Sequence, residues 1–279
     1  MTQIHPTAIV DKGAEIGNEV TIGPHCVIAA GVVLEDRVTL KGNVWVEGNV
    51  HIGEGSTVWP GAVLGAKTQD LKYRGEKTFV SIGKNTDIRE YVTINSSCGE
   101  GTHVKVGDGC LIMAYCHVAH NCEVGNRVIM SNNTMLAGHV IVEDFAIIGG
   151  LTGVHQHCRI GSYAMVGGMS GISNDVLPYT IGAGNPFRYG GLNLIGLKRH
   201  NMPLKTRSIL AQAFRLLVRS KLPLEVALRS IEQDLERIPE IEYLLNFCKN
   251  SKRGISALGG TCERPSPAKE EPQTVDATA

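Results

Sequence analysis

The chain has 279 residues, of which 43% are hydrophobic and only 5% aromatic, and its 27 basic and 27 acidic side chains give a formal net charge of zero. The length allows one long domain and a smaller one, and the balanced charge argues against a general nucleic-acid binder. No apolar run approaches the roughly 18 residues that cross a membrane, and residues 1–12 lack the apolar core of a signal peptide. We therefore expect a cytoplasmic protein with no nucleic-acid partner and no stable membrane insertion.

An aliphatic residue returns at every sixth position through most of the first 176 residues. The repeat has no gap between Val106 and Ile172, and its phase already begins at Ile4. A hexapeptide period is typical of a parallel β-helix, in which each hexapeptide supplies one short strand and one turn. Three hexapeptides then form one coil of about 18 residues, and residues one coil apart form columns along a prism.

Two segments interrupt the repeat, near residues 67–78 and 95–105. The chain returns to its original phase after each of them, which predicts loops that extend from a continuous prism. Loops on a rigid scaffold often carry binding and catalytic groups.

The repeat ends after Val176, and the chain then changes character. Residues 174–193 are rich in Gly, Pro and Tyr and predict an irregular exit, whereas apolar residues recur at helical spacing from Pro203, with further helix starts at Pro223 and Pro239. We predict a β-helix domain at residues 1–187, a helical domain at 188–254 that caps the solenoid, and a disordered tail at 255–279.

Five of the eight cysteines occupy the small inward position of the repeat and are therefore predicted to be buried thiols rather than disulfides or metal ligands. These are Cys26, Cys110, Cys116, Cys122 and Cys158.

Histidines are concentrated between His117 and His157, and none of them falls on an inward position. One predicted column holds His120, Gly138 and Gln156, and the adjacent column holds Asn121, His139 and His157. Adjacent coils should therefore bring the ring of His120 close to Gly138. This arrangement predicts a polar patch along one corner of the prism.

Another column is almost without side chains and contains Ala114, Asn132, Gly150 and Gly168. It predicts a groove along the prism that suits a long apolar ligand. Taken alone, the glycines are better explained by the tight turns of the coil.

Several motifs occur in order along the chain: QDLKYRGE at 69–76, HVAHNCEVGNRV at 117–128, LAGHVIVEDFAIIGG at 136–150, VHQHC at 154–158 and NLIGLKR at 193–199. Together with the hexapeptide prism they resemble the UDP-N-acetylglucosamine O-acyltransferases, the acyl-carrier-protein-dependent enzymes that begin lipid A synthesis in Gram-negative bacteria. The resemblance extends to about Gly254. It implies a left-handed β-helix that assembles as a homotrimer, with active sites between neighbouring prisms. Acyl carrier protein with its phosphopantetheine thioester would be the co-substrate, and no bound cofactor or metal is implied.

The resemblance also implies roles for individual residues. His120 would be the general base that accepts the proton of the sugar 3-hydroxyl, and the backbone N–H of Gly138 would stabilise the oxyanion. Gly168 would set the acyl length and admit a long chain. Substrate contacts are implied for Gln69, Asp70 and Lys72 from a neighbouring subunit, for His117, His139, His155 and Gln156 around the nucleotide sugar, and for Asn193 and Arg199 near the UDP.

Three positions depart from the family pattern. Asn121 follows His120 where the family commonly has Asp, Asn95 stands where a histidine is frequent, and Ile195 replaces an acidic residue. A basic surface for the acidic acyl carrier protein is predicted at Lys198, Arg199, His200, Lys205 and Arg207.

The sequence is also compatible with other functions. Clustered histidines on a trimeric β-helix can bind zinc, as in enzymes of the γ-carbonic-anhydrase kind, and a solenoid can also act only as a binding scaffold. The helical domain and the QDLK loop favour the acyltransferase. The nearest competing enzyme is the N-acyltransferase of the same pathway, which normally has an additional N-terminal domain, whereas the repeat here begins at Ile4.

Overall fold

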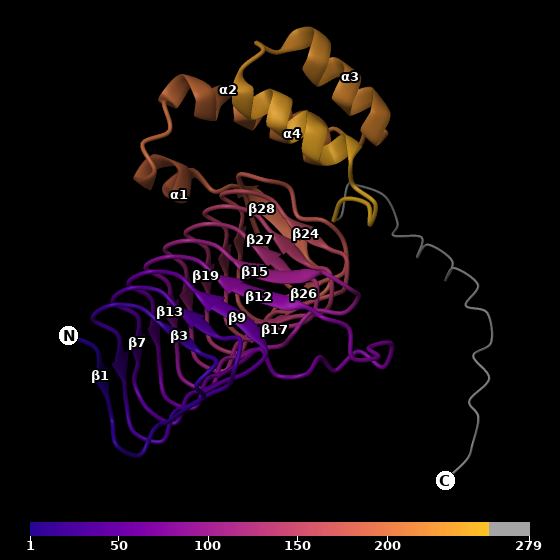
Figure 1. Cartoon of the computed structure of the whole chain (residues 1–279). Helices are drawn as coiled ribbons and strands as arrows, with labels where there is room; N and C mark the ends of the chain where they lie inside the picture. Colours follow the sequence, from indigo (N-terminus) through magenta and orange to yellow (C-terminus); the bar gives the residue numbers. More distant parts are fainter. Residues whose placement is uncertain (257–279) are drawn as a thin grey trace, which may run out of the picture.

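The computed structural model describes residues 1–256, which form a prism of stacked coils followed by short helices at its C-terminal end (Figure 1). Each complete coil contributes one strand to each of three sheets. The first sheet contains β1 (Gln3–Ile4), β4 (Thr21–Ile22), β7 (Thr39–Leu40), β10 (Thr57–Val58), β13 (Asp87–Ile88), β16 (Leu111–Ile112), β19 (Ile129–Met130), β22 (Ile147–Ile148), β25 (Met165–Val166), β27 (Thr180–Ala183) and β28 (Arg188–Leu192).

The other two sheets are parallel throughout. The second sheet contains β2 (Ile9–Val10), β5 (Val27–Ile28), β8 (Trp45–Val46), β11 (Val63–Leu64), β14 (Thr93–Ile94), β17 (His117–Val118), β20 (Met135–Leu136), β23 (Gly153–Val154) and β26 (Gly171–Ile172). The third sheet contains β3 (Glu15–Ile16), β6 (Val33–Leu34), β9 (Asn49–Ile52), β12 (Phe79–Ile82), β15 (His103–Val106), β18 (Glu123–Val124), β21 (Ile141–Val142) and β24 (Arg159–Ile160).

The strands pair in the register that the six-residue period predicts. His117 pairs with Met135, one coil further along the chain. The pairing stays in phase across both interruptions, since β14 pairs with β11 and with β17. The second loop ends at residue 102, earlier than predicted, because β15 begins at His103 and lengthens its ladder with β12.

The backbone at the corners explains how such short strands can turn so tightly. The second residue of most corner turns has a positive φ, including Asn121 at 56° and His139 at 61°. Only a minority of non-glycine residues adopt this conformation, and here the stacked coils hold it. The expected fold class, a left-handed parallel β-helix with a C-terminal α-helical domain, is confirmed. Its hand is an exception to the usual rule for parallel crossovers.

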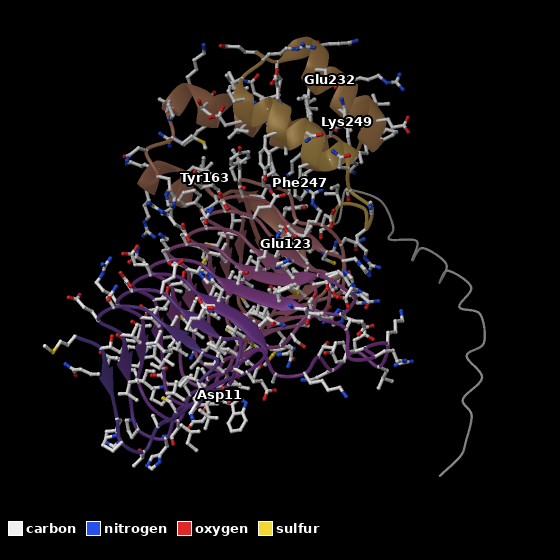
Figure 2. All side chains as sticks on the ribbon, viewed as in Figure 1. Asp11, Glu123, Tyr163, Glu232, Phe247 and Lys249 are labelled. Carbon is white, nitrogen blue, oxygen red and sulfur yellow. The ribbon has the colours of Figure 1, made fainter. Side chains whose placement is uncertain are left out.

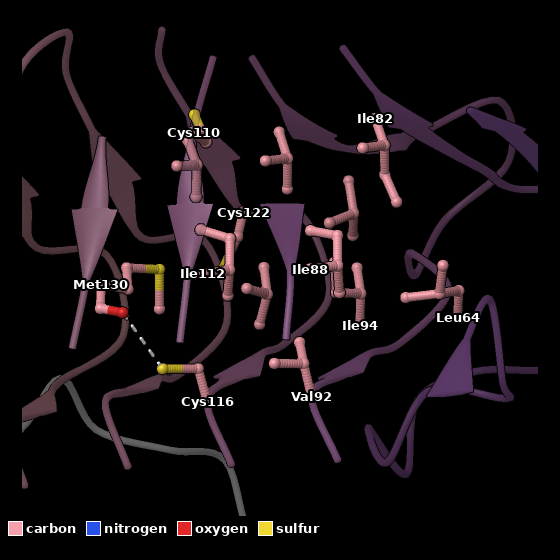
Figure 3. Close-up of a cluster of buried hydrophobic side chains, with 14 of the residues drawn as sticks. Leu64, Ile82, Ile88, Val92, Ile94, Cys110, Ile112, Cys116, Cys122 and Met130 are labelled. Carbon is pink, nitrogen blue, oxygen red and sulfur yellow. Dashed lines mark hydrogen bonds between the residues drawn. The ribbon is translucent and has the colours of Figure 1, made fainter. Parts of the chain in front are cut away.

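The prism is filled by the inward aliphatic residues, and Ile88, Ile112 and Met130 are completely buried. Figure 3 shows Cys110, Cys116 and Cys122 among these side chains. All five cysteines of the repeat are buried as free thiols, as predicted. Burial raises the pKa of Cys110 to about 11 and of Cys122 to about 12, so both remain protonated at neutral pH.

The helical domain covers the C-terminal end of the prism with a second hydrophobic core, to which the prism contributes Leu177 and Tyr179. Phe247 and Tyr163 lie close to this boundary (Figure 2). The helices are α1 (Leu194–Arg199), α2 (Leu204–Phe214), which continues into the π-helical segment η1 (Arg215–Arg219), α3 (Leu224–Asp234) and α4 (Pro239–Lys249). None of the helices within residues 1–256 is long and apolar enough to cross a membrane.

The segment between the prism and the predicted helices is more regular than the sequence suggested. β27 and β28 form an antiparallel pair that extends the first sheet beyond the predicted boundary at residue 187, and α1 precedes the first predicted helix. The hairpin and the short helix could not be predicted from periodicity because neither contains a sequence repeat.

A C-terminal strap, residues 250–256, returns from α4 to the prism. Its anchor is the buried Asp175, whose backbone C=O accepts from Ser256 N–H at 2.8 Å and whose Oδ2 accepts from Ser251 Oγ at 2.8 Å. Residues 255 and 256, which we assigned to a disordered tail, are therefore bound to the prism. The rest of the predicted tail, residues 257–279, lies outside the described residues.

Candidate active site

The predicted column of His120 and Gly138 is present at the corner between the second and third sheets. His139 N–H donates to His120 O at 3.0 Å, which places these coils in direct succession. A Cβ on Gly138 would overlap the imidazole ring of His120. Residue 138 must therefore be glycine for the ring to keep this position.

His120 is held by its neighbour in the turn. The Nδ1 atom of His120 lies 2.9 Å from Asn121 Oδ1. Asn121 in turn contacts the second loop, where its Nδ2 donates to Cys98 O at 3.1 Å and its Oδ1 accepts from Cys98 N–H at 3.3 Å. The second loop therefore fixes the amide that supports the imidazole.

Asp70 of the first loop faces the other side of the ring. Its Oδ2 lies 3.5 Å from His120 Nε2, and the two side chains are only 20% and 15% exposed. The Lys72 backbone N–H donates to Asp70 Oδ1 at 2.9 Å and holds the pKa of Asp70 below its usual value, an effect to which the charges of His120 and Lys72 add. We expected this loop to act from a neighbouring subunit. In the single chain described here, the loop folds back so that Asp70 faces His120 of its own prism.

The side chains of Gln69 and Lys72 are exposed beside Asp70. No hydrogen bond or ion pair joins either of them to the histidines within residues 1–256.

Three further histidines surround this corner. His117 projects from β17, where its Nδ1 lies 2.7 Å from Thr93 Oγ1. His139 stacks on His157 at 4.4 Å and meets the edge of His120 at 5.2 Å. Burial lowers the pKa of His117, His139 and His157, and nearby positive charges add to the effect in each case. The cluster therefore favours neutral imidazoles, which both donate and accept hydrogen bonds.

The corner continues into a groove of about 570 Å³. The groove lies between the stacked rings of His139 and His157 and the strap residues Lys252 and Arg253. The predicted site residues His155 and Gln156 lie nearby on the next coil, where both are exposed. Polar and positively charged groups thus border the histidine cluster.

Asn193 and Arg199 are not brought to this cluster within the described chain. Asn193 is 6% exposed, accepts from Gly196 N–H at 3.1 Å as the N-cap of α1, and donates to Tyr163 O at 3.0 Å. Both ends of its amide therefore have structural partners. Arg199 is exposed at the end of α1.

The column of small residues runs along a different corner, between the first and second sheets. A Cβ on Gly168 would lie 3.1 Å from Gly150 O, and Gly168 itself is exposed. Gly150 and Gly168 therefore place no side chain on the outside of this corner, where the sequence predicts a channel.

The residues that stand beside this column of glycines were not predicted from the sequence. At the next turn position a row of large apolar side chains, here called the apolar corner, is exposed to between 53% and 75%. It consists of Tyr91, Tyr115, Leu151 and Met169. Their shared position in the repeat was the signal that could have identified them.

A zinc site was one of the open alternatives. Among residues 1–256, no group of three or more His, Cys, Asp or Glu side chains is arranged so that it could hold a metal ion. The histidines instead contact Asn121, Thr93 and one another.

Two family models match the sequence. Residues 175–256 match the second domain of UDP-N-acetylglucosamine O-acyltransferase, and residues 1–36 and 103–138 match the bacterial transferase hexapeptide with six repeats. The first model covers the helical end of the fold, and the second covers two parts of the prism.

Named relatives match most of the chain. An acyl-[acyl-carrier-protein]–UDP-N-acetylglucosamine O-acyltransferase of Chlamydia caviae is 52% identical over 256 residues, which cover 91% of this chain and 92% of the relative. An enzyme of the same name from Thermodesulfovibrio yellowstonii is 48% identical over 257 residues, with coverage of 91% and 99%. The crystal structure of a UDP-N-acetylglucosamine acyltransferase from Bacteroides fragilis is 38% identical and has a TM-score of 0.88, covering 91% of this chain and 99% of that one. The chain therefore belongs to the acyl-[acyl-carrier-protein]–UDP-N-acetylglucosamine O-acyltransferase family.

Proposed function

We propose that the protein transfers a long fatty acyl chain from acyl carrier protein to the 3-hydroxyl of UDP-N-acetylglucosamine, the first step of lipid A biosynthesis, with His120 as general base. The observation that carries this proposal is the position of the His120 ring, which lies over Gly138 with its Nε2 facing Asp70 at 3.5 Å. The names of relatives that are about half identical support the same substrates.

The reaction needs only groups that this corner supplies. His120 Nε2 accepts the hydroxyl proton while the hydroxyl oxygen attacks the thioester carbonyl carbon. The C–S bond then breaks, and the imidazolium returns its proton to the departing phosphopantetheine thiolate. General base catalysis of this kind contributes a factor of about 10² to 10⁴ in rate.

The oxyanion formed at the carbonyl needs a donor. Within residues 1–256 the backbone N–H of Gly138 has no hydrogen-bond acceptor, which supports its role at this position. One such donor contributes a factor of about 10² to 10³.

The remaining polar groups suit a sugar substrate. Neutral His117 and His139 can donate to and accept from hydroxyl and amide groups. The side chains of His155, Gln69, Lys72 and Gln156 are exposed nearby. Lys252 and Arg253 add positive charge along the groove. We assign this groove and its surroundings to the nucleotide sugar.

We propose a homotrimer for two reasons. The apolar corner exposes large side chains that a second copy of the chain would cover. The channel at Gly150 and Gly168 lies across the second sheet from His120, so one prism alone does not bring an acyl chain in this channel to its own base. A neighbouring prism would supply the base.

The trimer also gives Arg199 a role. We propose that it reaches the UDP of a neighbouring site, and that Asn193 acts by capping α1, the helix that carries Arg199. The basic surface of Lys198, Arg199, His200, Lys205 and Arg207 would receive the acidic acyl carrier protein, although Lys205 is already paired with Glu236 at 2.7 Å. We propose the cytoplasm as the compartment of the reaction.

The test is to offer the purified protein UDP-N-acetylglucosamine with acyl carrier protein thioesters of graded chain length. We expect an ester at the 3-hydroxyl and a preference for long chains. Transfer only to the free amine of an acylated glucosamine would instead identify the N-acyltransferase. Hydration of carbon dioxide that depends on stoichiometric zinc would identify the metal enzyme.

A further inference from the structure

The side chain of Asn121 is bound at both ends. Its Oδ1 faces His120 Nδ1 at 2.9 Å and Cys98 N–H at 3.3 Å, while its Nδ2 donates to Cys98 O at 3.1 Å. Its own backbone N–H donates to Ser97 Oγ at 3.2 Å. The second loop thus binds both the main chain and the side chain of this residue.

These contacts allow only one orientation of the amide. Reversing it would place Nδ2 against the Cys98 N–H and Oδ1 against the Cys98 carbonyl, so that donors would face donors and acceptors would face acceptors. Because Oδ1 can only accept, the Nδ1 of His120 must carry the hydrogen. A neutral imidazole has one N–H, so Nε2 is left with the lone pair that a base requires.

An aspartate at position 121 would lose this arrangement. One carboxylate oxygen could still accept from His120, but the other would take the place of Nδ2 and face Cys98 O at about the same separation. Two acceptors would then be in contact, and the Cys98 carbonyl would lose its donor. The backbone of the second loop therefore selects asparagine.

Asparagine cannot stabilise a positive charge as a carboxylate does, and the first loop compensates for this. Asp70 Oδ2 lies 3.5 Å from His120 Nε2, the atom that receives the proton. The Lys72 backbone N–H keeps Asp70 ionised by donating to its other oxygen. A substrate hydroxyl that donates to Nε2 would therefore lie close to this carboxylate.

We propose that two loops share the support of the base: Asn121, held by the Cys98 backbone, fixes the tautomer of His120, and Asp70 stabilises the ring once it is protonated. This inference rests on the proposed role of His120. Asn121 is a positioning residue in this scheme. The titratable groups around His120 are Asp70, His117, His139 and His157, and Lys72 and the Cys98 thiol lie beside Asp70.

The first test needs no variant in the loops. ¹⁵N NMR of histidine-labelled protein, with the His120 signal assigned by its loss in His120→Gln, should show a neutral ring protonated at Nδ1. A ring protonated at Nε2 would overturn the proposal. This result does not depend on activity, so it stays distinct from failure of the proposed function, which retained transfer by His120→Gln would demonstrate.

The second test restores the residue common in the family. We expect Asn121→Asp to lower kcat by about tenfold or more and to shift the acid limb of the pH profile by about one unit to higher pH, because a carboxylate at Nδ1 favours the protonated ring. The control variant is Asn85→Asp, at an exposed turn position with a φ of 50° on another corner. It should leave kcat and the acid limb of the pH profile unchanged. A faster Asn121→Asp enzyme would contradict the proposed role of Cys98.

Asp70→Asn tests the proposed role of Asp70 in stabilising the protonated ring of His120. It should lower kcat by about tenfold or more and leave the Nδ1 tautomer of the free enzyme in place. An unchanged kcat would remove Asp70 from the scheme.

Discussion

The imidazole of His120 occupies the space in which residue 138 would otherwise carry its Cβ. Both residues take these positions from the repeat, since they are one coil apart in the same column. The base and the proposed oxyanion donor are therefore placed by the scaffold.

The first prediction follows from this contact. Gly138→Ala should lower kcat by about 10² or more, because the methyl group displaces the ring from its place beside Asp70. The ring can swing toward solvent, so the melting temperature should change little. A nearly normal kcat in the Gly138→Ala enzyme would show that the ring position does not matter for transfer.

A second prediction concerns chain length. Gly168→Met should shift the preference from long to shorter acyl chains by about tenfold in relative kcat/KM, since the new side chain would occupy the predicted channel beside Gly150. The kcat/KM values are measured with acyl carrier protein thioesters of graded length. An unchanged preference would mean that the acyl chain lies elsewhere.

Stability should depend on pH through His117. Its pKa is lowered in the folded state by burial and by His120, so the folded protein binds this proton less tightly than the unfolded chain does. Its contribution to stability is present above the unfolded value of about 6.5 and is lost as pH falls through the lowered pKa.

Urea unfolding between pH 7.5 and 5 measures this dependence. His117→Asn should have a smaller decline in its free energy of unfolding on acidification, by up to about 1.4 kcal/mol per pH unit. If the free energy of unfolding fell equally with pH in both proteins, His117 would be excluded as a source of this pH dependence.

The proposed trimer can be tested at the apolar corner. Tyr115 stacks on Tyr91 at 5.2 Å and is 53% exposed, so Tyr115→Lys should place charge in the interface between copies. We expect the mass in solution to fall from three chains to one, with loss of acyl transfer. Leu204→Lys, at a residue of α2 that is 73% exposed, should keep the wild-type mass. An unchanged mass for the Tyr115→Lys protein would place the interface on another surface.

Much of the fold could be predicted from the sequence because the period determines which side chains point inward. Val106 and Ile112 lie on one phase, and the strands that contain them pair as that phase requires. The same arithmetic brought His120 beside Gly138. Periodic residues are therefore placed by counting alone.

The remainder depended on segments without a period. The path of the first loop determines how closely Asp70 approaches His120. The path of the second loop determines the hydrogen bond between Asn121 and Cys98. The family motif identified Asn193, but its side chain proved to be a helix cap. A sequence motif can identify a residue, but it does not show which way the side chain of that residue points.

The most direct test of the account is the rate of acyl transfer by His120→Ala, compared with the wild-type enzyme at saturating substrates. If His120 is the base, the rate should fall by about 10² to 10⁴ while the melting temperature stays close to that of the wild type. Transfer at a rate within a few-fold of the wild type would contradict the central claim.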